Sequence, residues 1–419
     1  NSLLAVIDKT STGIGKRYLR DQLLNPISSV GAIEKRYDIV EFFYKDDNYK
    51  IYAEILSKIS DLEKYHRRIT MALIQPADFY FLDYSYENVL KLLEMTPSIP
   101  DDVRPDKEAI VSLSKFKGRI NEVFDIGKIT KYHIDNIDES FFKKGYSDLI
   151  DNLQEECDIV NGKLKAICKK FSKLCNQEVD VIFKLDYTDR DGYSITGTQT
   201  RCKNLKQKIL NFSDKTVSVI SKDFTIESKN ITFKNTTNSK TKIESPEINS
   251  LCSELRNLKT KIGNEGRKLF FETLQEFDKN YIHQLYPIID FIGNTDIYKT
   301  AAQVAHQYGY HRPKAVSCEN GFIKSKAIRH PIIERIQTKT EYVPNDIEIG
   351  TETQTGMLLY GTNASGKSSL MKAVGLNIIM AQAGFFTASQ EFTFSPYDHL
   401  FTRILNNDNI FKGESCFAV

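Results

Sequence analysis

The sequence lacks the features of a secreted, zinc-binding or membrane-spanning protein. Its seven cysteines are odd in number and form no C-x-x-C pair, which argues for reduced thiols in a reducing compartment. No apolar run approaches the roughly 18 residues of a membrane span, and the N-terminus has no signal-peptide pattern. The formal net charge is only +2, so any signal for nucleic acid has to be local. We therefore expect an intracellular protein without a membrane segment.

The two ends of the chain also lack the usual signals. The sequence starts at Asn1 without an initiator methionine, and Asn1–Ile7 already has the pattern of an ordered segment. It stops at Cys416–Val419, an apolar run with no breaker after it. We therefore expect a fragment of a longer protein. Its 419 residues, 41% of them hydrophobic, are enough for about two to four domains.

Helical periodicity dominates residues 1–150. An apolar stripe at Leu3–Ile7 precedes a break at Thr12-Gly13, and a second stripe at Tyr18–Leu24 ends before a proline. Further helices are expected near 52–74 and 78–95, the second capped by Asp78. This region reads as a helical scaffold.

A period of two residues replaces the helical pattern near residue 178 and predicts strands with one buried face. The alternating positions are Val181, Phe183 and Leu185, Val217 and Val219, Phe224 and Ile226, and Ile231 and Phe233. Turn-like stretches at 189–192 and 236–239 separate them. We expect a β-rich insert over 178–250.

Helix is expected again from residue 251 to 312. A packing seam with spacings of three and four comprises Phe270, Leu274, Phe277, Tyr281, Leu285, Ile288 and Ile292. Mixed strand and helix signals follow from residue 313.

Positive charge is concentrated in the β-rich insert. Between Thr200 and Lys242 there are ten Lys or Arg residues and three acidic residues. A solvated basic face is one interpretation. On a protruding β module, however, such a patch favours contact with a polyanion. Because the residues are mostly lysine with few aromatics, they suit phosphate contacts rather than base reading.

The clearest motif is Gly361–Ser368, which fits the phosphate loop G-x-x-x-x-G-K-[ST]. Met357–Tyr360 reads as a buried strand before it, and a helix is expected from Ser369 to Gly384. In such a loop the backbone N–H groups face the phosphates, Lys367 neutralises β- and γ-phosphate charge, and Ser368 ligates Mg²⁺. The expected ATP-binding residues are Gly361, Thr362, Asn363, Ala364, Ser365, Gly366, Lys367, Ser368 and Ser369.

The histidines show no metal-ligand spacing and are assigned to packing or to the surface. They are His66, His133, His283, His306, His311, His330 and His399. His330, between Arg329 and Pro331, is interpreted as a structural strand-edge residue rather than a catalyst.

Several short motifs surround the loop: Tyr360–Ala364, Met380–Gly384, Phe401–Ile404, Asn407–Asn409 and Phe411–Ser415. Together they resemble the ATPase of the MutS mismatch-repair family, and are most similar to the branch found in large DNA viruses and coral mitochondria. Bacterial MutS usually has Pro, Met and Gly where this chain has Thr362, Ala364 and Ser365. That branch shares the Thr-Asn-Ala form.

Weaker matches extend the resemblance over nearly the whole chain, and their order and spacing agree with the ATPase match. They are Ser2–Thr10 with Gly15, Arg17 and Leu19, Asp61–Glu63, Arg67-Arg68, Pro76, Gly145-Tyr146, Gly192-Tyr193, Thr232–Asn235, Ser245–Glu247, Tyr310–Pro313 and Arg329–Pro331. The implied fold is multidomain. A helical lever (1–177) is followed by a β-rich DNA clamp insert (178–250), returning lever helices (251–312) and the first part of an α/β P-loop ATPase of ABC type (313–419).

The resemblance implies roles for single residues. Asn363 is expected beside the γ-phosphate, as a catalytic residue together with Lys367. Tyr342 matches an aromatic that stacks on adenine, although an ordinary packed tyrosine is the alternative. Gly413 and Ser415 match a loop that reaches the partner subunit's nucleotide, where Cys416 replaces the usual Thr.

The implied function is that of an ATP-dependent DNA-binding clamp, which binds mismatched or damaged duplex DNA and changes state with ATP binding and hydrolysis. Lys234, Asn235, Lys240 and Lys242 are the expected DNA contacts, and ATP and Mg²⁺ the cofactors. The partners would be double-stranded DNA and a second subunit, in a homodimer or a MutS-family heterodimer. The alternative is a non-repair relative that binds branched or junction DNA with ATP as a clamp lock. A general chromosome-organising ATPase would need longer coiled-coil heptads.

Other parts of the family pattern would lie outside this sequence. The acidic segment that activates water and holds Mg²⁺ would follow Val419, so we expect little ATP hydrolysis from this chain alone. A mismatch-reading domain with Phe-x-Glu would precede Asn1, and a nuclease domain could follow the ATPase. The compartment stays open between a viral factory, a mitochondrion, a nucleus and a bacterial cytoplasm.

Overall fold

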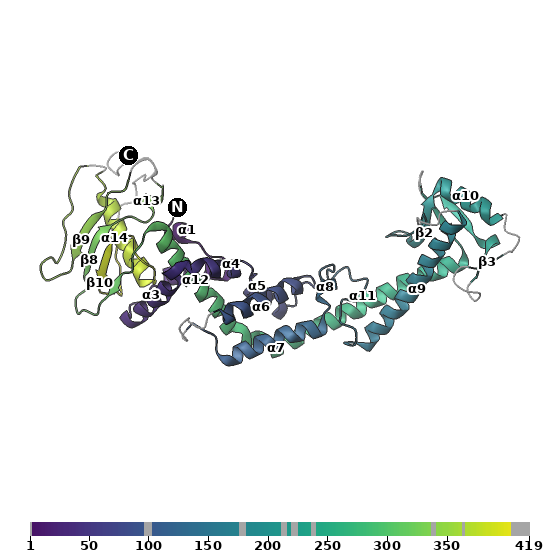
Figure 1. Ribbon diagram of the computed structural model, residues 1–419, viewed down its shortest axis with the longest axis horizontal. Coiled ribbons are helices and arrows are strands. Elements are labelled where there is room, and N and C mark those ends of the chain that lie inside the picture. The colour runs from purple at the N-terminus through teal and green to yellow at the C-terminus, as the bar shows by residue number, and fades with distance from the viewer. Residues whose placement is uncertain are drawn as a thin grey trace. The chain divides into compact units, whose positions relative to one another are not determined.

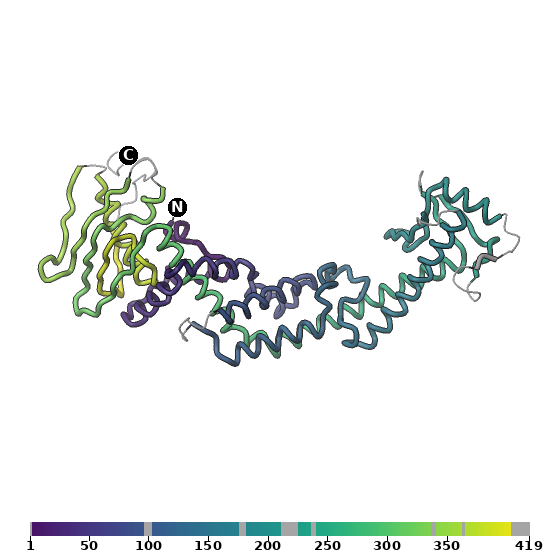
Figure 2. The backbone as a smooth tube through the Cα atoms, viewed as in Figure 1, coloured from purple at the N-terminus to yellow at the C-terminus, as the bar shows by residue number. Residues whose placement is uncertain are grey.

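The computed structural model describes residues 2–95, 103–175, 182–210, 216–218, 225–235, 240–336, 341–362 and 365–403 (Figures 1 and 2). The chain forms two compact units. The first comprises Asn1–Met71, Phe81–Lys117 and Phe277–Val419, and the second comprises Ala72–Tyr80 and Gly118–Glu276.

The first unit is mainly helical and carries one sheet. Its helices are α1 (Leu3–Ile7), α2 (Gly13–Leu24), α3 (Val30–Tyr44), η1 (Lys45–Asp47), α4 (Tyr49–Leu56), α5 (Leu62–Thr70), most of α6 (Asp78–Glu94) and of α7 (Lys107–Val123), η3 (Ile282–Leu285), α12 (Tyr286–Tyr308), α13 (Ile333–Ile336) and α14 (Lys367–Gln382). Its strands are β7 (Lys314–Ala315), β8 (Ile323–Ile328), β9 (Asn345–Ile349) and β10 (Glu391–Phe394).

Polar caps fix where the early helices begin. The Ser2 hydroxyl accepts from Ala5 N, and the Thr12 hydroxyl accepts from Gly15 N at 2.8 Å. The helix expected over 52–74 is in fact two, α4 and α5. Asp61 explains the division, because its carboxylate accepts from Lys64 N and caps α5. Aspartate is favoured at the N-cap of a helix and disfavoured in its interior.

Helix α12 is the central helix of the first unit and packs against α2, α3 and α4. Most of its residues are buried. Close approach depends on two glycines: a Cβ at Gly293 would lie 2.6 Å from the Tyr18 ring, and one at Gly15 would lie 2.2 Å from Asp296. The predicted seam is confirmed, since all its members but the half-buried Tyr281 are buried. It runs over α11, η3 and α12, however, and not along one helix.

The sheet of the first unit has the order β7-β10-β8-β9. Only the β7–β10 pair is parallel. The strand predicted at Met357–Tyr360 is wrong for the described residues. Leu358 and Tyr360 are 89% and 87% exposed, and no described strand pairs with this segment. A strand needs a neighbouring backbone to take its N–H and C=O groups, and apolar composition alone does not supply one.

The second unit combines long helices with small antiparallel sheets. Its helices are α8 (Ile126–Ile129), α9 (Asp148–Leu174), α10 (Gln199–Leu210), η2 (Ser228–Asn230) and most of α11 (Pro246–Asn280). Its strands are β1 (Lys184–Thr188), β2 (Gly192–Thr198), β3 (Thr216–Ser218), β4 (Thr225–Glu227), β5 (Thr232–Asn235) and β6 (Lys240–Glu244). The larger sheet has the order β1-β2-β6-β5, and β3 pairs with β4.

Strands are confirmed at Leu185 in β1, Val217 in β3, Ile226 in β4 and Phe233 in β5, and the turn at 189–192 joins β1 to β2. Phe183 and Ile231 lie just before β1 and β5, and burial does not alternate regularly along β1. Val181, Val219, Phe224 and residues 236–239 lie outside the described residues. The helix α10 was not expected inside the β-rich insert. Its buried residues Cys202, Leu205 and Ile209 belong to the same core as Ile195 and Ile243 of the sheet.

Candidate nucleotide site and basic surfaces

Hydrogen bonds within the phosphate loop hold it around the ammonium group of Lys367. Lys367 Nζ donates to the backbone oxygens of Gly361 (2.9 Å) and Thr362 (2.6 Å). Ser365 N donates to Thr362 O at 3.3 Å. Gly366 has φ of +93°, in the left-handed region that glycine adopts without strain. The described parts of the loop thus curl around the Lys367 side chain.

The helix predicted after the glycines is confirmed as α14, which begins at Lys367, two residues before the expected start at Ser369. The first-turn amides of Lys367, Ser368 and Ser369 have no acceptor within the helix and lie at the positive end of its dipole. These donors and the Lys367 ammonium suit an anion of phosphate type, whose oxygens could replace the two loop carbonyls as acceptors. The Ser368 hydroxyl is on the same turn, where the motif predicts a Mg²⁺ ligand.

Other expected nucleotide-site residues remain predictions. Asn363, Ala364, Gly413, Ser415 and Cys416 lie outside the described residues. Tyr342 is half-buried in the segment before β9. Burial raises the pKa of its hydroxyl, and the nearby Glu334 charge adds to this effect.

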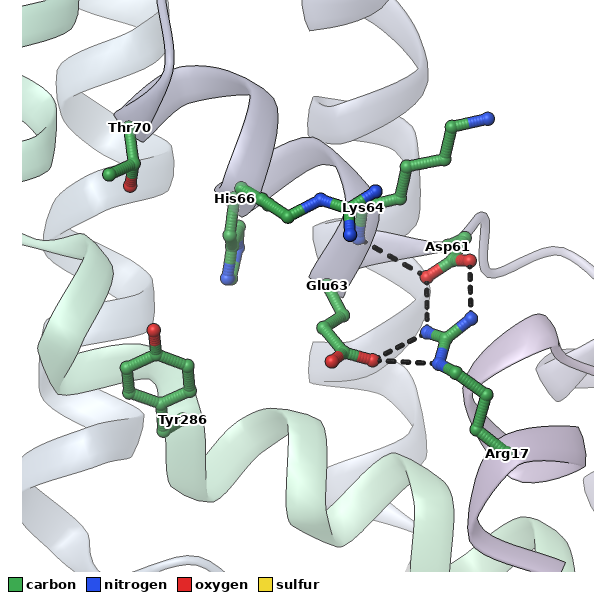
Figure 3. A pocket seen from close by; sticks show the side chains of 8 residues that line it. Arg17, Asp61, Glu63, Lys64, His66, Thr70 and Tyr286 are labelled. Carbon is green, nitrogen blue, oxygen red and sulfur yellow. Dashed lines mark hydrogen bonds and ion pairs between the residues drawn. The ribbon is translucent and has the colours of Figure 1, made fainter. Parts of the chain in front are cut away.

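A separate cavity of about 370 Å³ lies beside α5 in the first unit (Figure 3). Figure 3 shows Arg17 from α2 between Asp61 and Glu63. Its guanidinium contacts Asp61 at 2.7 and 2.8 Å and Glu63 through Nε at 2.9 Å, and these hydrogen bonds raise the Arg17 pKa. We interpret the cluster as a tie between α2 and α5, because the guanidinium is already engaged by two carboxylates.

The predicted DNA contacts lie on the β5–β6 hairpin. Lys234 is opposite Lys242 in the register, and Lys240 shares their face by alternation. Asn235 is on the other face, where it accepts from the Thr241 hydroxyl at 2.8 Å. Acidic neighbours partly neutralise the lysine face, because Lys240 contacts Asp186 at 3.0 Å and Lys242 contacts Glu244 at 2.9 Å.

Helix α10 forms a second basic surface, on the opposite side of that sheet. It has no acidic residue, and its four cations Arg201, Lys203, Lys206 and Lys208 are all exposed. None of the four makes an ion pair with a carboxylate among the described residues. These charges were expected in a β-rich insert, not on a helix. The spacing of Cys202, Leu205 and Ile209 was the signal that could have predicted the helix.

Two histidines, His66 and His330, are buried in the first unit, and His330 caps a helix. His330 Nδ1 accepts from Ile332 N and Ile333 N, both at 3.2 Å, and caps α13. Desolvation lowers the pKa of both His330 and His66 to about 4, so both are neutral near pH 7. His330 therefore has a structural role, as predicted. It caps a helix, however, and does not lie at the edge of a strand. The described residues contain no cluster of three or more His, Cys, Asp or Glu able to hold a metal ion.

Comparison with known proteins decides the family. The model of MutS domain III matches residues 1–302, and that of MutS domain V matches residues 357–419. The chain belongs to the MutS family.

The described helices include none that is long and apolar enough to cross a membrane.

Relatives of this MutS-family chain come from viruses, mitochondria and bacteria. A DNA mismatch repair MutS homologue of Acanthamoeba polyphaga mimivirus is 32% identical, over all of this chain and 41% of the relative. The mitochondrial DNA mismatch repair protein mutS homolog of Sarcophyton glaucum is 26% identical, with the same coverage of 100% and 41%. MutS of Lactococcus lactis subsp. cremoris is 28% identical over 100% of the chain and 46% of the relative. The chain thus spans less than half the length of these curated relatives, and the resemblance to the viral and coral branch is confirmed.

Proposed function

We propose that this chain is part of an ATP-dependent DNA clamp of MutS type. The clamp binds mismatched or otherwise distorted duplex DNA and changes state with ATP binding and hydrolysis. The observation that supports this most is the glycine loop with Lys367 at the start of α14, within the segment similar to MutS domain V. Such an arrangement suits a nucleoside triphosphate better than an uncharged ligand.

Each described loop residue then has a defined task. Lys367 exchanges its bonds with the Gly361 and Thr362 carbonyls for bonds to the β- and γ-phosphates. The amides of Gly366 to Ser369 would bind phosphate oxygens, and the Ser368 hydroxyl would hold Mg²⁺. Mg²⁺, when bound, supplies neutralising charge for the developing phosphate anion. Asn363 beside the γ-phosphate and Tyr342 on the adenine complete the proposed site.

The proposed domain layout is the one expected from the sequence: lever (1–177 and 251–312), clamp (178–250) and partial ATPase (313–419). Hydrolysis of ATP would require the acidic segment, proposed beyond residue 419, that holds Mg²⁺ and activates water. Two subunits would pair through their ATPases, with Gly413 and Ser415 completing the partner's nucleotide site. The partner would be a second copy or another MutS-family chain.

DNA binding is proposed to use the phosphate backbone. Lys234, Lys240 and Lys242 remain candidate contacts, with Asn235 beside them. The α10 face is a second candidate, supported by four cations without a carboxylate on the helix. Cations in a first turn and like charges three residues apart both destabilise an isolated helix, so a nearby polyanion would stabilise α10. Contacts of this kind position DNA without reading its sequence.

The alternative function is binding of branched or junction DNA with ATP as a lock. Family membership does not separate the two, because a backbone-binding clamp fits either substrate. Competition between a mismatched duplex, a matched duplex and a four-way junction, with protein from the complete reading frame, would decide between them.

The nucleotide site is tested with Lys367→Ala in protein from the complete reading frame. We expect ATP turnover to fall at least about a hundredfold, because a phosphate-neutralising cation is lost. ATP should no longer change DNA binding, while the thermal midpoint stays near that of the wild type. Lys324→Ala is the matched control, since Lys324 lies on β8 and contacts Glu348 at the surface. Hydrolysis at the wild-type rate by Lys367→Ala would refute the site.

A further inference from the structure

The end of α14 that lies away from the phosphate loop is bound by helices α2 and α3. Helix α14 spans 16 residues, or about 24 Å along its axis. The last carbonyls of any α-helix lack partners within the helix. At this end three consecutive carbonyls accept hydrogen bonds from the segment 22–37: those of Ala381 and Gln382 in the helix and that of Ala383, its C-cap.

The donors come from both helices and from the turn between them. Tyr37 Oη donates to Ala381 O at 2.7 Å, and Ile27 N donates to Gln382 O at 3.2 Å. Gln22 Nε2 and Arg36 Nη1 both donate to Ala383 O. Tyr37, Ala381 and Ala383 have no exposed surface. Water therefore cannot readily replace these hydrogen bonds. Ala381 O also accepts from Gly384 N at 2.9 Å, so loss of the Tyr37 bond removes one of the hydrogen bonds that this buried carbonyl accepts.

The side chain of Gln382 adds a second connection. Its Nε2 donates to Ile27 O at 3.0 Å and to Tyr397 O at 2.9 Å, and its Oε1 accepts from Tyr397 N at 3.1 Å. One buried amide thus joins the turn after α2, the end of α14 and the segment after β10. The chain then turns at Gly384, whose φ is +85° and where a Cβ would lie 2.8 Å from Arg36 Cδ. The absence of a side chain at Gly384 therefore leaves room for the Arg36 side chain against this turn.

These contacts connect the two family domains within the first unit. Residues 22–37 belong to the segment similar to MutS domain III, and α14 to that similar to MutS domain V. An α-helix is a stiff element, so a shift at the Lys367 end moves the Gln382 end as well. If phosphate binding displaces α14, helices α2 and α3 must either follow or lose these buried hydrogen bonds.

We propose that the contacts of Gln22, Ile27, Arg36 and Tyr37 with the end of α14 transmit the nucleotide state of the phosphate loop to the lever helices. We name this set the α14 latch. It rests on the proposed ATP-dependent function and adds the route by which the nucleotide acts. Gln382 and Tyr37 are positioning residues that touch neither nucleotide nor DNA. They set how the start of the lever follows the loop.

The test uses the double variant Gln22→Ala/Tyr37→Phe in protein from the complete reading frame. It removes one donor from α2 and one hydroxyl from α3 and leaves the loop unchanged. The matched control is Arg20→Ala/Tyr44→Phe, which removes one polar side chain from α2 and one hydroxyl from α3. Neither group makes a hydrogen bond to α14 among the described residues, and the Tyr44 ring, which packs against Phe386, is kept. ATP turnover without DNA, the ratio of DNA dissociation rates with and without ATP, and the thermal midpoint are measured for each protein.

We expect the latch variant to keep ATP turnover within about twofold of the wild type. The ratio of its DNA dissociation rates with and without ATP should fall at least about fivefold, toward a value of 1. The reason is that the coupling between the nucleotide site and the DNA site is lost, whereas DNA binding itself is kept. The control should match the wild type in both readouts. If the double variant does not fold, Tyr37→Phe alone, which removes no packing volume beyond an oxygen, should show a smaller loss in the same direction. An unchanged ratio in a folded latch variant would overturn the proposal.

Hydrogen exchange separates failure of the latch from failure of the proposed function. In the wild type, addition of ATP should slow exchange in residues 365–370 and also change exchange in 22–37. In the latch variant only the first effect should remain. Protection of 365–370 without any change at 22–37 in the wild type would refute the latch and leave the nucleotide site standing. Absence of both effects would refute the proposed function, and the latch with it.

Discussion

Asp296 and Lys299 form a fully buried ion pair one turn apart on α12, with Lys299 Nζ 3.0 Å from Asp296 Oδ1 and neither side chain exposed. Both also bind the segment before α2. Asp296 accepts from Ser11 N, Thr12 N and the Thr12 hydroxyl, and Lys299 Nζ donates to Lys9 O at 2.7 Å. Desolvation lowers the Lys299 pKa although the Asp296 charge opposes it. The pair therefore depends on complete hydrogen bonding to keep its charges.

This ion pair predicts a non-additive stability effect. Lys299→Met and Asp296→Asn should each lower the free energy of unfolding by about 3–5 kcal/mol, because each leaves a buried charge without its partner. The double variant should lose less than the sum of the two. Lys16→Met, which removes an exposed cation 3.4 Å from Asp8, is the control and should cost under about 1 kcal/mol. Urea denaturation checks these values, and additive losses would contradict the pairing.

The two basic surfaces of the second unit can be separated by their salt dependence. If α10 contacts DNA phosphates, changing Arg201, Lys203, Lys206 and Lys208 to Gln should weaken binding equally for all sequences. The slope of log affinity against log salt should fall by up to about 0.9 per lost contact. Lys234, Lys240 and Lys242 changed to Ala test the sheet face in the same way. Their effect should be smaller, because Asp186 and Glu244 already neutralise two of them.

The control for both sets is Lys165→Ala/Lys169→Ala, which removes two exposed cations from α9 in the same unit. A slope unchanged by the α10 substitutions, with folding intact, would mean that α10 is only a solvated basic face. A loss confined to mismatched DNA would contradict contact with the phosphate backbone.

His330 and His66 predict that the first unit loses stability in mild acid. Their folded-state pKa of about 4 lies below the usual 6.5, so between these values the unfolded chain binds more protons. The free energy of unfolding should therefore fall as the pH drops from about 6.5 to about 4, by at most roughly 3 kcal/mol for each histidine. His330→Asn keeps an acceptor for the cap of α13 but does not titrate, so it should flatten the pH dependence of the thermal midpoint. An unchanged pH dependence in a folded His330→Asn variant would contradict this assignment.

Local chemistry explains which parts of the fold the sequence could predict. The apolar stripe at Tyr18–Leu24 predicted α2, and the glycines with Lys367 predicted the turn into α14, because such patterns act over a few residues. Thr12, interpreted as a break, is in fact the N-cap of α2. The predicted strand at Met357–Tyr360 failed because strand formation depends on a partner that may be far away in sequence, which no local pattern reveals.

The same limit applies to the candidate surfaces. A count of charges located the basic insert but did not show that Lys240 is paired with Asp186, 54 residues away. Nor could it place the α10 cations and Lys234 on opposite sides of one sheet. The latch on α14 was equally hidden, since it joins Tyr37 to a carbonyl 344 residues away. Contacts of this kind follow from tertiary packing alone.

The proposed sharing of nucleotide sites between subunits predicts complementation. Let one subunit carry Lys367→Ala and the other Ser415→Ala. If Ser415 serves the opposite subunit, one composite site contains both lesions and the other contains neither, whereas every site of each homodimer is damaged. Mixing the two variants, under conditions where subunits exchange, should therefore restore ATP turnover that neither shows alone. Cys416 reduces the loss of turnover expected from Ser415→Ala, because a thiol is a weaker hydrogen-bond donor than the hydroxyl of the usual Thr. The Ser415→Ala homodimer should therefore be only partly impaired. Turnover is measured against mixing ratio, and a curve that never exceeds the weighted average of the two homodimers would rule out action across the dimer.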